Sequence, residues 1–275
     1  QSANFKPGAA KGWALYPTRA YFADITIANR VIGVSTSQEL EDAITLLTDV
    51  GGGEIRLAAG TYTITTAQAI PSSIRFLGDN SSTTTIVFTG SANFTMTGTN
   101  VYTTGTVSIN QGSTSLTGSG TTFTSAMVGR QIFLSNRWYV ISAFGSTTAL
   151  TLATAFADAN LSGSTYRISS VIKDVEFEEL TIVGASGTKV IDAIDVRDIN
   201  FTDVIISTSG ASGLGLEIDN FMSVDSDRFT VSGIPATTSH GISATNGSFL
   251  NLRQTATVSN GGSGLSNPAA APRRA

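Results

Sequence analysis

The chain has 275 residues, of which 41% are hydrophobic and only 13% are charged, with a formal net charge of −4. It is long enough to bury a sizeable core, and its balance of charges gives no global sign of a nucleic-acid or anionic-membrane partner. The absence of cysteine excludes disulfides, thiol nucleophiles and cysteine-ligated zinc, and the single histidine, His240, excludes metal sites built from several histidines.

Residues 1–34 are predicted to form an extended docking arm. Its first cations, Lys6, Lys11 and Arg19, precede the first acid, Asp24. Five aromatic side chains are interleaved with them, namely Phe5, Trp13, Tyr16, Tyr21 and Phe22. Aromatic and basic side chains on an extended segment favour docking into grooves of a neighbouring protein. Packing along the chain's own body is the alternative, and nucleic-acid binding by so few cations is disfavoured.

Residues 37–50 are predicted to form a helix. Thr36 or Ser37 caps its start, Gly51 follows its end, and three apolar side chains recur at helical spacing, Leu40, Ile44 and Leu47. Short strands follow up to about residue 100, and each places two apolar residues on one face. We interpret 35–100 as a capping helix with the first coils of a solenoid.

The pattern changes between residues 101 and 170. Six short segments look like strands with hairpin spacing, at 106–109, 115–117, 131–134, 138–141, 149–152 and 166–168. We interpret this stretch as a small antiparallel β-domain inserted at a loop, where insertions cost least. Trp138 and Tyr139 suit a stacking platform for a glycan, and packing in the core of the insert is the alternative.

An internal repeat marks residues 171–267. The segment DVEFEELTI at 174–182 recurs as DINFTDVII at 198–206, a shift of 24 residues. A drifting period of 24 to 27 residues, filled with strands, is typical of the coils of a parallel β-helix. We therefore predict an all-β fold, a right-handed parallel β-helix with an N-terminal capping helix and an inserted antiparallel β-domain. Residues 268–275 are assigned to a tail.

Carboxylates on these coils are the candidates for catalysis. At a shift of 24, three acid pairs would stack about 5 Å apart, Asp174 with Asp198, Asp195 with Asp219 and Asp203 with Asp227. Such pairs resemble catalytic dyads, so Asp203, Asp225 and Asp227 are the candidate catalytic residues.

A shift of 25 gives a different reading of the same residues. It places Asp203 beside Arg228 as a surface ion pair. His240 is interpreted as a turn residue, and no metal site or cofactor is predicted.

The run GGGEIRLAAGTYTI at 51–64, with IRFLG at 74–78 and TIVF at 85–88, resembles the opening coils of pectin-lyase-like right-handed β-helix proteins. Such openings are frequent in bacteriophage tailspikes. The stretch GSTSLTGSGTTF at 112–123, with YVIS at 139–142, is similar to a small β-module of phage virion proteins. The family's polygalacturonase pattern is missing, except for the fragment around His240. The resemblance implies a homotrimer bound to a capsid or tail by its N-terminal part.

We therefore expect a structural and adhesive virion component that attaches through its N-terminal arm and contacts host surface polysaccharide. Its expected partners are two further copies of the chain and other phage capsid or tail proteins. We expect no nucleic acid partner and no membrane insertion, because no apolar run approaches the roughly 20 residues of a membrane helix. A polysaccharide-degrading enzyme, either a glycoside hydrolase or a lyase, is the alternative. A cellular adhesin would need an export signal, and none is visible.

Overall fold

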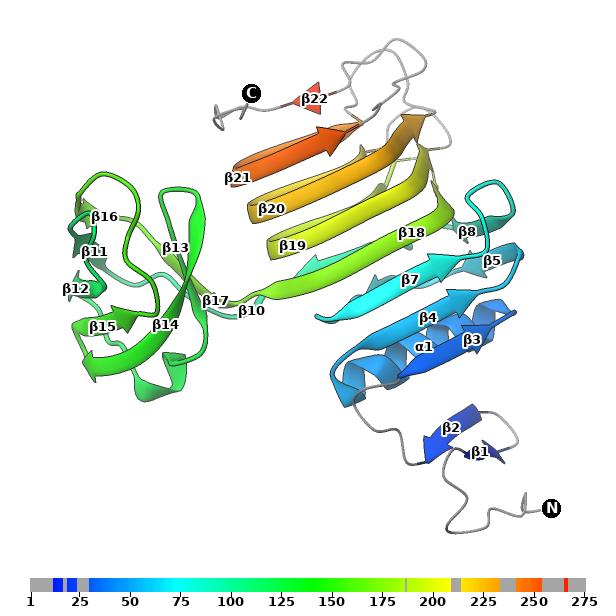
Figure 1. Ribbon diagram of the computed structural model, residues 1–275, viewed down its shortest axis with the longest axis horizontal. Helices are drawn as coiled ribbons and strands as arrows, with labels where there is room; N and C mark the ends of the chain where they lie inside the picture. The colour runs from blue at the N-terminus through cyan, green and yellow to red at the C-terminus, as the bar shows by residue number, and fades with distance from the viewer. Residues whose placement is uncertain are drawn as a thin grey trace.

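The computed structural model describes residues 30–253 except 186, 209–213 and 233–240, and it gives the backbone of three further strands. These are β1 (Gly12–Tyr16), β2 (Arg19–Ala23) and β22 (Leu265–Ser266). β1 and β2 form an antiparallel hairpin. Figure 1 shows the two bodies that follow, a stack of parallel strands and a smaller antiparallel domain beside it.

The helix α1 (Ser37–Val50) is confirmed at its predicted bounds. Thr36 is its N-cap, and Glu39 completes a capping box, because the Thr36 Oγ1 accepts from the Glu39 amide while the Glu39 carboxylate accepts from the Thr36 amide. Gly51 ends the helix in the left-handed conformation, with φ of 80°. The buried side chains of α1 join the core of the first coils, so the helix closes one end of the β-helix.

The main sheet is parallel, and its strands follow one another up the stack. From the N-terminal end they are β3 (Val31–Val34), β4 (Gly53–Leu57), β7 (Ile74–Gly78), β18 (Ile172–Gly184), β19 (Lys189–Thr208), β20 (Leu214–Ser232), β21 (Ile242–Arg253) and β22. β5 (Gly60–Ile64) and β8 (Thr84–Phe88) form a second side of the early coils, and β6 (Gln68–Ala69) and β9 (Phe94–Thr97) form a third.

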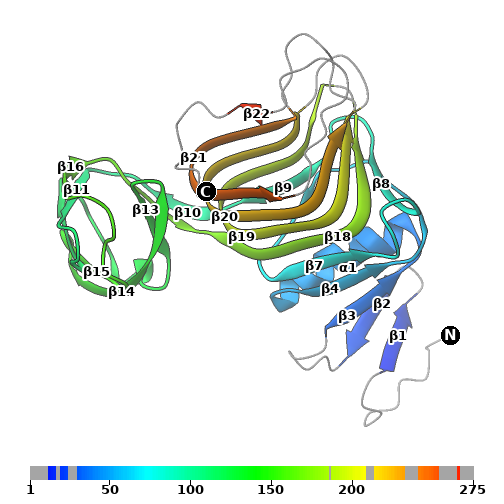
Figure 2. The same ribbon diagram turned by 45° about the horizontal axis from the view of Figure 1, so that its top comes forward.

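Segments on either side of the insert lie side by side and run in the same direction. β18 pairs in parallel with β7 and β8, and β19 pairs in parallel with β9. The predicted parallel β-helix is therefore confirmed, and the chain resumes the same stack after the insert (Figure 2). The coil length grows up the stack: Val175 pairs with Ile199, Val204 with Phe229 and Leu216 with Ile242, so successive registers differ by 24, 25 and 26 residues.

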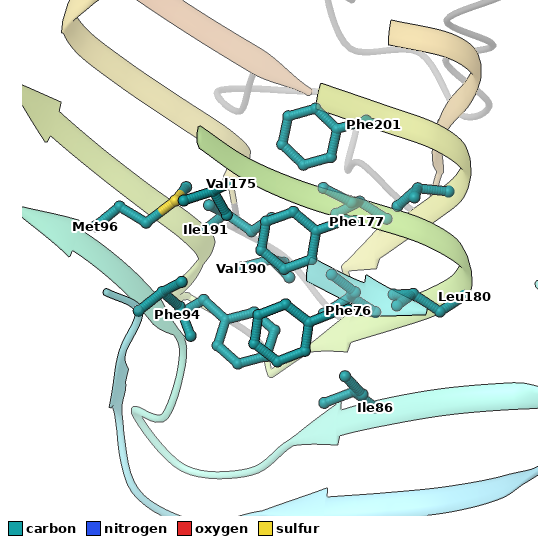
Figure 3. Packing of buried hydrophobic residues seen from close by; sticks show 14 of the residues in the cluster. Phe76, Ile86, Phe94, Met96, Val175, Phe177, Leu180, Val190, Ile191 and Phe201 are labelled. Carbon is teal, nitrogen blue, oxygen red and sulfur yellow. The ribbon is translucent and has the colours of Figure 1, made fainter. Parts of the chain in front are cut away.

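A column of stacked phenylalanines fills the interior (Figure 3). The ring centroids of Phe76 and Phe177 are 5.1 Å apart and those of Phe177 and Phe201 are 5.4 Å apart, with interplanar angles of 5° and 8°. In β20 the small Ser226 lies in register with Phe201, and the column continues through Phe229, 5.0 Å from Phe201. Fully buried aromatic rings of this kind contribute large apolar area to the core.

The corners between the flat sides are residues with positive φ. Asp174, Asp198 and Ser223 occupy equivalent positions in three successive coils, with φ of 57°, 54° and 60°. Asp and Asn tolerate this left-handed conformation better than most residues, because their short polar side chains bond locally. The aspartates at these positions therefore have a structural reason to be there.

The insert forms an antiparallel sheet with its own core. Its strand order is β10 (Thr99–Tyr102), β17 (Arg167–Ser170), β13 (Gln131–Leu134), β14 (Arg137–Ser146), β15 (Ala149–Leu152), β12 (Ser115–Ser119), β11 (Thr106–Ile109) and β16 (Leu161–Ser164). The predicted antiparallel character is confirmed, and the sequence pattern had missed β10 and β16. The division of the chain into units at 1–34, 35–100, 101–170, 171–267 and 268–275 stays a prediction.

The phenylalanine column predicts a strong dependence of stability on Phe201. Phe201→Ala is expected to lower the free energy of unfolding by about 3–5 kcal/mol, because it removes transfer free energy and leaves a cavity between stacked rings. Phe144→Ala is the matched control, since Phe144 lies on β14 with 37% of its surface exposed. Urea unfolding followed by circular dichroism measures both variants, and equal losses would contradict the assigned role of the column.

Candidate functional site

Two outer faces of the β-helix differ sharply in chemistry. The first is made by β4 and β7 and by the parts of β18, β19, β20 and β21 that pair with them in register, at 176–178, 200–202, 225–227 and 251–253. We call it the charged face, and its outward side chains are Glu54, Arg56, Arg75, Leu77, Glu176, Glu178, Asn200, Thr202, Asp225, Asp227, Asn251 and Arg253. These residues stand in two columns that run up the coils.

The second face is made by β5, β8 and the last residues of β18, β19 and β20. We call it the uncharged face, and its outward side chains are Thr61, Thr63, Thr85, Val87, Thr181, Val183, Ile205, Ser207, Thr230 and Ser232. A corner at Glu179, Asp203 and Arg228 separates the two faces in the later coils.

Ion pairs connect the lower part of the charged face. The Arg75 guanidinium lies 3.0 Å from a Glu54 oxygen and 3.5 Å from a Glu176 oxygen, and it also pairs with Glu178. Partial burial alone would raise the pKa of Glu54, but hydrogen bonds and charge from Arg56 and Arg75 outweigh it and lower the pKa. The hydrogen bond to Glu178 is the main reason that the pKa of Arg75 is raised.

A polar hollow of about 540 Å³ lies at the N-terminal end of the charged face. Its lining includes Glu54, Arg75, Glu176, the corner residue Asp174 and Ser73. The volume is in the range of small-ligand sites, and carboxylates, guanidinium groups and hydroxyls are suitable hydrogen-bond partners for a sugar. Sequence reasoning had missed this hollow, because its walls come from strands separated by about a hundred residues.

The predicted catalytic acids are all on the β-helix surface, but two of the expected acid stacks are wrong. Because β19 and β20 are offset by 25 residues, Asp227 lies in register with Thr202 rather than with Asp203. The same offset pairs Ile194 with Asp219, so Asp195 does not stack on Asp219. The third stack is present, since Asp174 and Asp198 hold equivalent corner positions.

Each candidate catalytic acid forms an ion pair or a hydrogen bond with a neighbouring side chain. Asp203 lies 3.9 Å from the Arg228 guanidinium, as the 25-residue register predicted, and accepts a hydrogen bond from Ser81 at 3.3 Å. Arg228 also pairs with Asp227 at 3.2 Å. Asp225 accepts from the Asn251 amide at 2.9 Å. Asp225 and Asp227 point outward from the same strand two residues apart, and their catalytic role stays a prediction.

The two aromatic residues proposed for glycan contact are buried. Trp138 is 3% exposed and Tyr139 is 6% exposed. They alternate along β14, so that Tyr139 joins the core of the insert while Trp138 faces the β-helix. The indole N–H of Trp138 donates to the Asn220 carbonyl at 2.8 Å. A sugar stacked on either ring stays a prediction, and in this structure both rings pack against protein.

A buried ion pair fixes the insert to the β-helix next to this tryptophan. Arg167 of β17 donates to both oxygens of Asp195 in β19, at 2.6 and 2.8 Å, and the Asp195 side chain has no exposed surface. Asn220 of β20 also donates to Asp195, at 3.1 Å. Gln131 of the insert accepts from Arg197 at 3.1 Å. The only sequence signal for this junction was the polar residues at corner positions, which did not identify their partners.

For four of the remaining predicted site residues, the structure describes only the backbone. Trp13 and Tyr16 belong to β1, and Tyr21 and Phe22 belong to β2. Phe5 and His240 lie outside the described residues. Virion docking by the arm therefore stays a prediction. Within the part of the chain that the structure describes, no group of three acidic or histidine side chains is arranged to hold a metal ion, and no helix is long and apolar enough to cross a membrane.

The chain is similar to several solved structures. One is the tailspike gp61 of Pseudomonas phage phi297, with 14% identity and a TM-score of 0.49 over 82% of this chain and 41% of that one. Another is the tailspike Gp54 of Acinetobacter baumannii bacteriophage AP22, solved with a capsular saccharide, with 10% identity and a TM-score of 0.39 over 78% and 50%. A third is the A-module of mannuronan C-5 epimerase AlgE6 of Azotobacter vinelandii, with 12% identity and a TM-score of 0.39 over 84% and 53%.

The chain thus spans about half the length of these structures or less. At such low identities and TM-scores, the likenesses say nothing about the activity or partners of this chain. No protein-family model matches the chain, and no curated protein matches it.

The junction predicts a large effect of one isosteric substitution. Asp195→Asn removes the charge that Arg167 requires at a fully buried position, and we expect it to lower the free energy of unfolding by roughly 2–4 kcal/mol. Asp227→Asn is the matched control, because its ion pair with Arg228 is half exposed and such pairs contribute only about 0–1 kcal/mol. Urea unfolding of both variants measures the difference. A similar, small loss in the two would contradict a structural role for the Arg167–Asp195 pair.

Proposed function

We propose that the chain is a structural and adhesive component of a phage particle, assembled as a homotrimer and attached through its N-terminal arm. The observation that carries the adhesive part is the polar hollow on a rigid β-helix wall. The resemblance of residues 51–88 and 112–142 to phage β-helix and virion modules supports the assignment to a phage particle, and mass spectrometry of purified particles tests it.

The proposed ligand of the hollow is a surface polysaccharide of the host. Sugars offer many hydroxyl groups, and the hollow offers carboxylate, guanidinium and hydroxyl partners from three neighbouring coils. The β-helix supports these groups on strands rather than on loops. Pre-organised groups lose little entropy on binding, which favours recognition of a flexible polymer.

The glycan contact predicts an effect of Asp174→Asn. Asn tolerates the positive φ of this corner, so the fold is retained, while the loss of a charged acceptor is expected to weaken glycan binding by about tenfold or more. Asp42→Asn on α1, outside the hollow, is the control. Interferometry against immobilised capsular and O-chain polysaccharides measures the affinities. The proposal of glycan contact fails if the chain binds none of them, and the assignment to the hollow fails if both variants bind like the wild type.

A polysaccharide-degrading enzyme is the second candidate function, and one observation favours it. Asp225 and Asp227 point outward from one strand two residues apart, so their Cα atoms are separated by about 6.4–6.8 Å. The two carboxyl groups of inverting glycoside hydrolases are roughly 6.5–9.5 Å apart, a separation that two outward carboxylates of one strand can reach.

The enzyme hypothesis predicts cleavage products that depend on both acids. If it is correct, the chain releases reducing ends from a bound polysaccharide, and Asp225→Asn and Asp227→Asn each lower the rate at least a hundredfold, because general acid or base catalysis is lost. A reducing-end assay measures this, with Asp192→Asn, on another side of the coil, as the control. Cleavage that persists in both variants would exclude these residues, and an absence of cleavage would favour pure adhesion.

A further inference from the structure

The uncharged face is unusual for a solvent-facing surface of this protein. In β18 the outward residues before the corner Glu179 are Glu176 and Glu178, whereas those after it are Thr181 and Val183. The same change occurs in β20, where Asp225 and Asp227 precede Arg228 and Thr230 follows it. All ten outward positions of the uncharged face lack charge, over five stacked strands. The chemistry therefore changes at a corner and follows the faces of the fold, not the segments of the sequence.

Most side chains of this face are β-branched. Thr, Val and Ile account for eight of the ten, and Ser207 and Ser232 for the other two. β-branched side chains are already restricted at χ1, so they lose little rotamer entropy when a partner covers them. A stacked parallel sheet is also regular and stiff. The face is therefore suited to packing against another flat surface.

The insert leaves this face open. Its polar contacts with the β-helix lie at Asp195, Arg197 and Asn220, near the start of the later coils. Figures 1 and 2 both place β8 on the far side of the β-helix from the insert, and Figure 1 places β5 beside it. A second large body can thus approach the uncharged face without meeting the insert.

We propose that the uncharged face packs against a second copy of this chain, which rests on the homotrimer of the proposed function and assigns that assembly a surface. Each copy has a net charge of −4 and carries ion-paired side chains on its charged face. Copies that met through charged faces would have to desolvate those ions, whereas uncharged faces meet without that cost. The face offers no cation for a nucleic acid and no charge for an oppositely charged protein, whereas the same face of another copy is equally uncharged. In the proposed trimer, the three copies turn this face towards a common threefold axis.

The size of the face sets the strength of the expected association. The face is five strands wide, with strands about 4.8 Å apart, and about five residues long, at about 3.3 Å per residue. Its area is therefore roughly 400 Å². A standard interface buries about 800 Å² on each partner. The face is therefore expected to supply about half of a stable interface, and assembly through it should depend on protein concentration unless adjoining residues extend the contact.

The test places one charge on each face of the same strand. Ile205→Lys introduces a cation within the uncharged face, and Thr202→Lys, three residues earlier in β19, introduces the same cation on the charged face. Thr230→Lys is a second variant of the uncharged face, in case the first does not fold. Circular dichroism checks the fold. Sedimentation velocity and native mass spectrometry from about 1 to 100 µM measure assembly.

We expect the wild type and Thr202→Lys to assemble alike, and Ile205→Lys and Thr230→Lys to require at least tenfold higher concentrations. If folded Ile205→Lys and Thr230→Lys assemble like the wild type, or if Thr202→Lys disrupts assembly equally, the assignment of this face is wrong while the trimer stands. A wild type that remains monomeric throughout overturns the trimer together with the face. Glycan binding by the same samples tests the adhesive part of the proposed function separately.

Discussion

The stacking of each coil on the coil beneath it is the constraint on which the rest of this structure depends. A parallel strand bonds to its neighbours on both edges, and its inward side chains must meet those of the coils above and below at a spacing of about 4.8 Å. The phenylalanine column obeys this rule from Phe76 through Phe177 to Phe201. Outward side chains are free of the rule, so the surface can differ from face to face while the interior repeats.

The corners make this stacking compatible with a turning chain. Each corner needs a residue with positive φ, and stacked coils put such residues in columns, for example Asp195, Asn220 and Asn246 with φ of 59°, 50° and 47°. Asp and Asn at these places bond to one another across coils, as Asn220 does to Asp195. An aspartate that recurs at the period of a β-helix is therefore explained by backbone conformation first. Catalytic interpretations of such residues need an additional observation.

Local features of the fold were predictable from the sequence because their causes are local. The capping box of Thr36 and Glu39, the apolar spacing of the helix and the alternation of the early strands all lie within a few residues of one another. The 24-residue repeat between 174–182 and 198–206 also holds in three dimensions. For the next coil the sequence left shifts of 24 and 25 open, and the structure has the shift of 25, which places Asp227 beside Thr202 rather than Asp203.

The candidate site was less predictable, since its parts are distant in the sequence. Packing within the insert was one of two interpretations of Trp138, and the hydrogen-bond partner of its indole, the Asn220 carbonyl, lies on the β-helix. Arg167 and Asp195 belong to different bodies, and no period connects them. The walls of the polar hollow come from strands on both sides of the insert. Periodicity identifies what repeats, whereas contacts between a repeat and an insertion occur once and leave no pattern.

One corner and two faces of the β-helix therefore differ in their chemistry within one set of coils. The corner at Asp195 and Asn220 holds the insert through a buried ion pair and an indole hydrogen bond. The charged face holds the hollow, where ionised groups are kept in place by pairing with one another. The uncharged face lacks such pairs. A neighbouring surface of apolar and hydroxyl groups can replace the contacts that this face makes with water. β19 and β20 each contribute to all three surfaces, so a single strand passes from the attachment of the insert through the charged face to the uncharged face.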